Sequence, residues 1–162
     1  MNALAIFGIS AALSFASSVV AAKLYVWPWL RKRGCHEALA SLTAPHLFLR
    51  FIGLSVLVTG VVSPALPKAF AIPVAYGDLV AGILAIFATI ALAKKRSWAV
   101  GTAWVFNIWG TADFLYAFYE GPHAEIQPGM LGAAFYLITA IVPILLVTHF
   151  LSFGVLLRVR AS

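Results

Sequence analysis

Charged residues are scarce in this sequence. Of its 162 residues only 10% are Asp, Glu, Lys or Arg, whereas 63% are hydrophobic. A soluble domain usually carries roughly 25% charged residues, because its surface must be solvated. The shortage excludes an ordinary soluble domain and predicts that most of the surface faces lipid. A chain of this length is expected to form one domain, so we predict a single all-α transmembrane domain over residues 1–162.

Cysteine and acidic residues are also rare. Cys35 is the only cysteine, so the chain can form no internal disulfide, and we interpret it as an incidental thiol despite its basic neighbours. Five acids stand against eleven Lys and Arg, which gives a net charge of +6. The basic residues form short clusters at the ends of apolar runs, a pattern typical of membrane orientation signals. We therefore expect membrane lipids, and not nucleic acid, as partners.

The familiar motifs of catalysis and cofactor binding are missing. The chain contains no GxGxxG, P-loop, HExxH, CxxC or nucleophile-elbow pattern. It also has no detectable internal repeat, so the sequence does not support an inverted-repeat transporter. No metal site is predicted, and the motifs identify no cofactor.

Five apolar runs are long enough to cross a bilayer, which takes roughly 17–25 residues each. They cover residues 3–29, 44–63, 75–93, 97–119 and 129–157. Pro67 and Pro73 argue against a continuous helix from the second run into the third, and residues 121–128 form another turn-rich break. No basic residue precedes the first run, so we expect a retained span and not a cleaved signal peptide.

The basic residues predict the orientation of a five-helix bundle. With the N-terminus outside and the C-terminus in the cytosol, only Lys68 among the Lys and Arg residues lies outside. The other ten lie on or toward the cytosolic side, where such residues accumulate: Lys23, Arg31, Lys32, Arg33, Arg50, Lys94, Lys95, Arg96, Arg158 and Arg160. Trp27, Trp29 and Trp98 fall at inner helix ends, as interfacial anchors do. We expect a multi-pass protein of the bacterial cytoplasmic membrane.

The fifth run is too long for a straight crossing. It is uncharged from Ile126 to Leu157. As a helix this stretch measures roughly 48 Å, against a hydrocarbon thickness of ~30 Å. Pro143 cannot donate a hydrogen bond to the carbonyl of Thr139, so we predict a kink near the middle of this helix. The kink either shapes a cavity or serves packing alone, and the sequence does not decide between the two.

Small residues recur at helical spacing in three of the runs. We interpret these stripes as the faces where helices pack, because lipid supplies no hydrophobic drive between helices. They comprise Asp78, Gly82, Ala85 and Thr89 in the third run, Gly53 and Gly60 beside Arg50 in the second, and Ser10, Ser14 and Ser17 in the first. The faces that carry Arg50 and Asp78 are therefore expected to point into the bundle.

Polar residues near the cytosolic side form a first candidate layer. Arg50 in the second run and His149 in the fifth are predicted to lie at similar depth, roughly 9 and 12 Å from the cytosolic helix ends. They could meet if their helices are neighbours and bind a carboxylate, a phosphate or a lipid headgroup. The alternative for Arg50 is that it reaches the cytosolic interface. We expect His46 to cap the start of its helix.

A second candidate layer lies toward the outside. Asn107, Gly110 and Asp113 recur every three residues and form a slanted polar ribbon along the fourth run, with Trp109 and Tyr116 close to them in sequence. Without a basic residue at its depth, Asp113 is expected to be protonated or hydrogen-bonded to Asn, Tyr or Trp donors. These residues form either a site or interhelical contacts only, and Asp78 is expected to cap its own helix.

These layers lead to a first hypothesis: a membrane-embedded binding protein, with or without catalysis, for a lipophilic small molecule such as a lipid or isoprenoid. Its candidate ligand-binding residues are Arg50, Asp78, Asn107, Trp109, Asp113, Tyr116 and His149, and its candidates for acid–base catalysis are Asp113 and His149. One alternative is a haem-binding electron-transfer subunit that uses His149 and His46. Another is a conduit for protons or small solutes. A homo-oligomer or an accessory subunit of a larger membrane complex is also compatible with the sequence.

Overall fold

The computed structural model of the protein describes residues 1–161, with side chains to Arg158. Helices make up 81% of it, and strands are absent from the described residues. The side chain of Arg160, counted above among the cytosolic basic residues, lies outside the described part. The predicted all-helical class is confirmed.

The helical elements follow one another as five long segments, three of them divided into shorter helical pieces. In chain order they are α1 (Ala3–Ala21), η1 (Ala22–Val26) and α2 (Trp27–Leu30); α3 (Cys35–Thr43), α4 (His46–Leu49) and η2 (Arg50–Leu57); α5 (Lys68–Ala93); α6 (Ala99–His123) and η3 (Pro128–Met130); and α7 (Ala134–Tyr136), η4 (Leu137–Ile141) and α8 (Val142–Ala161). Within the described residues, four stretches are long and apolar enough to cross a membrane: Ala3–Leu30, Cys35–Leu57, Lys68–Ala93 and Ala134–Arg158. The helix α6 is also long, but polar residues such as Asn107 and Asp113 lower its hydropathy.

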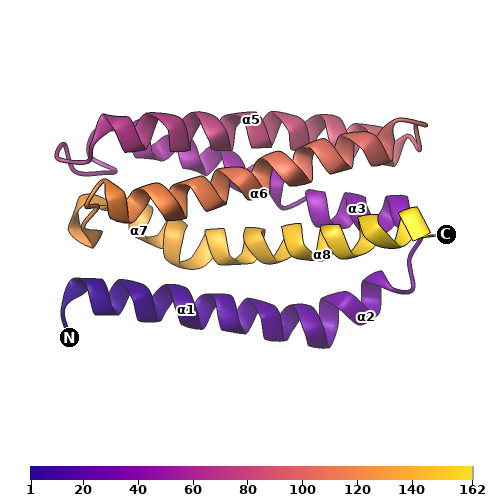
Figure 1. The fold of residues 1–162 in the computed structure, drawn as a ribbon, viewed down its shortest axis with the longest axis horizontal. Coiled ribbons are helices and arrows are strands. Elements are labelled where there is room, and N and C mark those ends of the chain that lie inside the picture. Colours follow the sequence, from indigo (N-terminus) through magenta and orange to yellow (C-terminus); the bar gives the residue numbers. More distant parts are fainter. Residues whose placement is uncertain (162) are drawn as a thin grey trace.

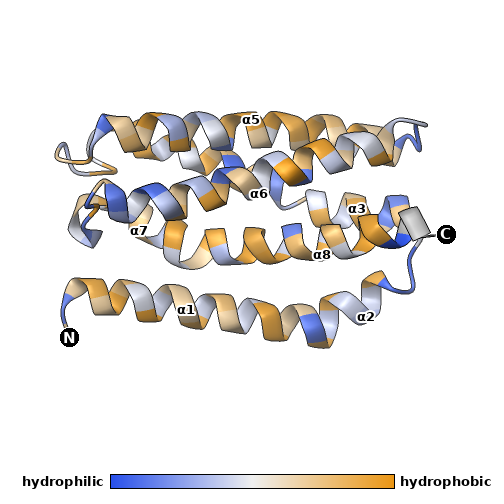
Figure 2. Ribbon diagram, in the orientation of Figure 1, coloured by the Kyte–Doolittle hydropathy of each residue, from blue (hydrophilic) through white to orange (hydrophobic). Residues whose placement is uncertain are grey.

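The long segments run side by side, with the two chain ends at opposite ends of the molecule (Figure 1). The helices α5 and α6 pack along each other, and α8 lies between α6 and α1. The helix α1 is the outermost, and none of its residues is buried. Figure 2 shows hydrophilic stretches at both ends of the molecule and along α6, whereas the middle parts of α1 and α5 are mostly hydrophobic.

The starts of the second and third segments differ most from the sequence prediction. The second segment begins at Cys35 and ends at Leu57, whereas residues 44–63 were predicted. The third begins at Lys68, with Pro67 just before it, instead of at residue 75. Proline is tolerated at a helix start because the first N–H groups have no intrahelical partner there. The predicted break between these two segments is confirmed, since residues 58–67 are not helical.

The fifth segment shows the expected irregularity at Pro143. The wide helical turn η4 lies directly before this proline, and regular α-helix resumes in α8. Because Pro143 has no N–H, the regular hydrogen bond to the carbonyl of Thr139 cannot form. The side chain of Thr139 turns back instead and donates to the carbonyl of Phe135 at 2.8 Å.

Small residues bring the helices together in the predicted stripes of the second and third runs. Asp78, Gly82 and Ala85 of α5 are buried, and further alanines extend the same stripe. Gly53 lies directly against the carboxylate of Asp78. The prediction for Gly60 is wrong, because this residue lies in the turn after η2 with a φ of +94°.

The end of the molecule that holds the C-terminus gathers the basic residues and tryptophans. The guanidinium of Arg33 lies 4.2 Å from the ring centre of Trp29, and that of Arg158 lies 4.3 Å from the ring centre of Trp27. Trp98 is exposed at the same end, where α6 starts. Such cation–aromatic pairs are typical of a membrane–water interface.

Candidate functional site

Arg50 is the centre of the candidate site, and it is completely buried. It follows fifteen residues after the start of its segment at Cys35, which corresponds to roughly 22 Å along a helix. This places it near the middle of the bundle and not near the end that holds the C-terminus. An unpaired charge at such a depth is costly, so the partners of Arg50 decide what the residue does.

Two carboxylates from different helices bind the same nitrogen of Arg50. Its Nη1 donates to Asp78 Oδ1 of α5 at 2.6 Å and to Asp113 Oδ2 of α6 at 2.7 Å. Its Nη2 donates to the carbonyl of Gly110 at 2.7 Å. The ring centre of Phe114 lies 3.7 Å from the guanidinium carbon. Arg50 therefore ties η2, α5 and α6 together through charged hydrogen bonds.

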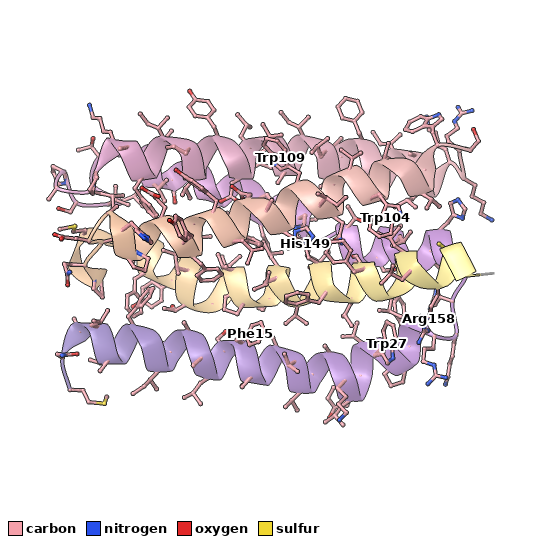
Figure 3. All side chains as sticks on the ribbon, in the orientation of Figure 1. Phe15, Trp27, Trp104, Trp109, His149 and Arg158 are labelled. Atoms are coloured by element: carbon pink, nitrogen blue, oxygen red, sulfur yellow. The ribbon has the colours of Figure 1, made fainter. Side chains whose placement is uncertain are left out.

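His149 of α8 accepts the second hydrogen bond from Nη2. Its Nε2 lies 3.0 Å from this nitrogen, which can only donate, so the proton of the imidazole must lie on Nδ1. Nδ1 is 2.7 Å from Asn107 Oδ1, an acceptor, which agrees with this assignment. The amide nitrogen of Asn107 donates to the main-chain oxygen of His149 at 3.3 Å. In Figure 3, His149 projects from the middle of α8 toward α6.

His46 completes the set of acceptors around Arg50. Its Nδ1 accepts from Nε of Arg50 at 3.4 Å. Its Nε2 is 2.8 Å from Thr148 Oγ1, and this hydroxyl donates to the carbonyl of Leu145 at 2.7 Å. All five N–H groups of Arg50 thus have a protein acceptor, and both imidazoles are neutral in this pattern.

Glycines leave the space that this cluster needs. A Cβ added to Gly110 would lie 2.6 Å from Cε1 and Nε2 of His149 and 2.7 Å from Nη2 of Arg50. A Cβ added to Gly77 would collide with Oδ1 of Asp113. Only residues without a side chain allow the charged groups to approach the backbone of α5 and α6 this closely.

The structure unites the two predicted layers in one cluster. The predicted contact between the side chains of Arg50 and His149 is confirmed. The ribbon of Asn107, Gly110 and Asp113 also faces one way, toward these two residues. The alternative that Arg50 reaches the cytosolic interface is wrong, because its side chain is fully buried.

Three other predictions about these residues are wrong. His46 is not a helix cap but a buried partner of Arg50 and Thr148. Asp78 lies ten residues inside α5, far from the helix start. Asp113 does have a basic partner, Arg50, because the guanidinium reaches from the inner layer to the outer one.

Trp109 and Tyr116 lie outside the cluster. Trp109 is 45% exposed and donates from Nε1 to the carbonyl of Gly77 at 3.2 Å, which joins α6 to α5 (Figure 3). Tyr116 is 40% exposed. The residue that the sequence prediction missed is Phe114, whose ring covers Arg50. Its position next to Asp113 was the only signal available.

A mostly apolar cavity lies away from the cluster, at the end of the molecule opposite the C-terminus. It has a volume of about 570 Å³ and lies between α1, α6 and the segment that joins α6 to α7. Its walls include Phe7 of α1, Phe70 of α5 and Phe118 of α6, and two polar residues, Glu125 and Gln127, also line it. None of the seven predicted ligand-binding residues lines it.

The comparisons with known proteins assign the chain to a family. No curated protein and no solved structure matches it significantly. A family model described as Domain of unknown function (DUF8737) matches residues 6–157, which is nearly the whole chain. The protein therefore belongs to this family.

Proposed function

We propose that the protein crosses the membrane five times and holds a lipophilic small molecule in the cavity at its outer end. Four segments are apolar enough to cross. The fifth, α6, has 25 residues, roughly 37 Å of helix, and turns Asn107 and Asp113 inward, where Arg50 and His149 satisfy them. An odd number of crossings also agrees with chain ends on opposite sides of the molecule (Figure 1).

The cavity itself carries the functional proposal. Its volume of about 570 Å³ falls within the range of roughly 300–1,000 Å³ typical of small-molecule sites. Aromatic and aliphatic side chains dominate its walls, and Glu125 and Gln127 add a few polar groups. Such a site suits a molecule with a long apolar body and one polar end, such as a lipid or an isoprenoid.

The polar cluster has a different role in this proposal. The hydrogen-bond donors of Arg50 are all used by protein acceptors, so a ligand would have to displace one of them. We assign to the cluster the task of fixing α5, α6 and α8 relative to one another, so that the cavity keeps its shape. Catalysis by Asp113 or His149 is therefore not part of the proposal.

Two neighbouring alanines of α1 allow a matched test. Ala11 lines the cavity, whereas Ala12 is exposed on the outer face of the same helix. Ala11→Trp should fill the cavity and Ala12→Trp should not. After gentle detergent extraction, mass spectrometry should find a bound lipophilic molecule in the wild type and in Ala12→Trp, and about tenfold less in Ala11→Trp. If Ala11→Trp retains as much as the wild type, the bound molecule is lipid of the general surface and the proposal fails.

The other functions considered receive less support from the geometry. The ring centres of His46 and His149 lie 4.5 Å apart, and both Nε2 atoms are engaged by protein partners, which leaves no space for a macrocycle between the rings. A conduit for protons or solutes would need a hydrated path, whereas Arg50 is fully enclosed. An accessory role in a larger complex would use the exposed helix α1, and co-purification of a defined partner would favour it.

A further inference from the structure

We propose that Asp78, Arg50 and Asp113 form a proton-binding site, in which the two carboxylates together hold one dissociable proton. The hydrogen bonds around Arg50 determine which of its neighbours are charged, and this balance of charges requires a proton. It does not depend on the cavity or on its ligand.

The hydrogen-bond pattern sets the charge of every group that faces the site. Nε2 of His149 and Nδ1 of His46 both accept from Arg50, so both imidazoles are neutral. Asn107 and Thr148, which bind the far sides of these rings, are uncharged. One guanidinium from η2 therefore stands against two carboxylates, one from α5 and one from α6.

With both carboxylates ionised, the cluster would carry one uncompensated negative charge. A buried ion without a counterion costs several kcal/mol, and a group in this position usually neutralises. The remaining basic residues lie in the end segments of the molecule, apart from this cluster. The neutral His46 and His149 already accept from Arg50 and cannot gain a proton without facing one of its donors. A proton on one of the two carboxylates restores neutrality at the least cost.

The geometry provides a place for this proton. Each carboxylate binds Arg50 through one oxygen only, Oδ1 of Asp78 and Oδ2 of Asp113. The second oxygens lie against the backbone at Gly53 and Gly77. The side chains of Asp78 and Asp113 are 9% and 8% exposed, whereas that of Arg50 is 0% exposed. The two carboxylates are therefore less enclosed than the guanidinium, and a proton on either of their second oxygens leaves all the hydrogen bonds of Arg50 in place.

Composition makes this site unusually easy to observe. Asp78 and Asp113 are the only aspartates in the chain. Aspartate labelled with ¹³C at its carboxyl group therefore shifts infrared bands of this pair and of no other residue. In the purified full-length protein at neutral pH, we expect one protonated aspartate per molecule. Raising the pH should remove the infrared band of this protonated carboxyl group.

Three variants test whether the number of protonated aspartates follows the balance of charges in the cluster. Asp78→Asn and Asp113→Asn should each abolish the labelled band, because the remaining carboxylate is balanced by Arg50. Arg50→Gln should double it, since neither carboxylate then has a counterion. Glu120→Gln, at the outer end of α6, should leave the band unchanged.

The result that overturns the proposal is equally clear. A wild type without a protonated aspartate band at neutral pH carries two ionised carboxylates, and no proton site exists. A band that survives in both asparagine variants shows that the proton does not depend on the pair. The thermal unfolding of each variant is measured in parallel, and if Arg50→Gln does not fold, the two asparagine variants decide the question alone.

Discussion

At the scale of single residues, Arg50 has the largest predicted effect on stability. Arg50→Gln removes the only positive charge between two buried carboxylates and leaves Gly110, His46 and His149 without their donor. Breaking a buried ion pair in this way costs about 3–5 kcal/mol. We expect a lower thermal unfolding temperature in detergent, whereas Arg96→Gln, in the exposed turn between α5 and α6, should change stability by less than about 0.5 kcal/mol.

A compensating variant shows whether the loss has an electrostatic cause. Arg50→Gln combined with Asp78→Asn and Asp113→Asn removes the two carboxylates, which without Arg50 must either stay ionised without a counterion or take up a proton. It also keeps the approximate shapes of all three side chains. This triple variant should be more stable than Arg50→Gln alone. Equal or lower stability would mean that Arg50 acts through packing and not through its charge.

The sequence could predict which of these residues are buried, but not how they pair. Ionisable residues in an apolar run need partners, and this argument identified Arg50, His149 and the ribbon of Asn107 and Asp113. It failed for the pair of Arg50 and Asp113, because depth was counted from residue 44 and not from Cys35. The error placed Arg50 about nine residues too close to the cytosol, and it ignored the reach of the arginine side chain.

At the scale of elements, two glycines of α6 test how closely the helices must approach. A Gly→Ala change inside a helix normally stabilises it by about 1 kcal/mol. Gly101→Ala should behave in this way, because an added Cβ there meets no other atom within 4 Å. Gly110→Ala places a methyl group against His149 and Arg50, and we expect it to destabilise the protein by about 1–3 kcal/mol.

Thermal unfolding of the two variants in the same detergent compares these opposite effects directly. If both variants unfold at the same temperature, α6 has room to move and the cluster does not fix its position. The comparison keeps the helix and the substitution constant, so that only the surroundings of the added methyl group differ.

Most elements could be predicted, and their starts could not. The five apolar runs correspond to the five long helical segments, and Pro143 correctly indicated the irregular turn before it. The predicted break after Leu57 is present, but Pro73 lies inside α5 and not in the break. The start at Cys35 was missed because the second run was predicted to begin at residue 44, with His46 as the helix cap after Thr43 and Pro45. In the structure the chain continues through them, with the N–H of Leu49 bound to the carbonyl of Pro45. Local sequence cannot distinguish a proline that begins a helix from one that the surrounding bundle accommodates.

At the scale of the whole molecule, the charges of the end segments agree with one orientation. Lys94, Lys95 and Arg96 lie at the same end as the C-terminus, in the turn between α5 and α6 (Figure 1). The other end carries few basic residues, of which Lys68 is one. Because cytosolic loops accumulate Lys and Arg, the end with the C-terminus should face the cytosol. Whether the protein has five spans depends on whether α6 crosses the membrane. Among the long segments, only α6 is not apolar enough to be assigned as a span by its hydropathy.

Cysteine labelling on intact cells tests this crossing, and the single native cysteine makes a clean background. In a Cys35→Ser chain, single cysteines are introduced at Ala65, Ser97 and Gln127, which are all exposed. Ser97 and Gln127 lie on either side of α6. A maleimide that cannot cross the membrane should label the cysteines at Ala65 and Gln127 at once, and the one at Ser97 only after permeabilisation. If the cysteine at Gln127 is protected together with that at Ser97, α6 does not cross, and the buried cluster would have to form in a four-span protein.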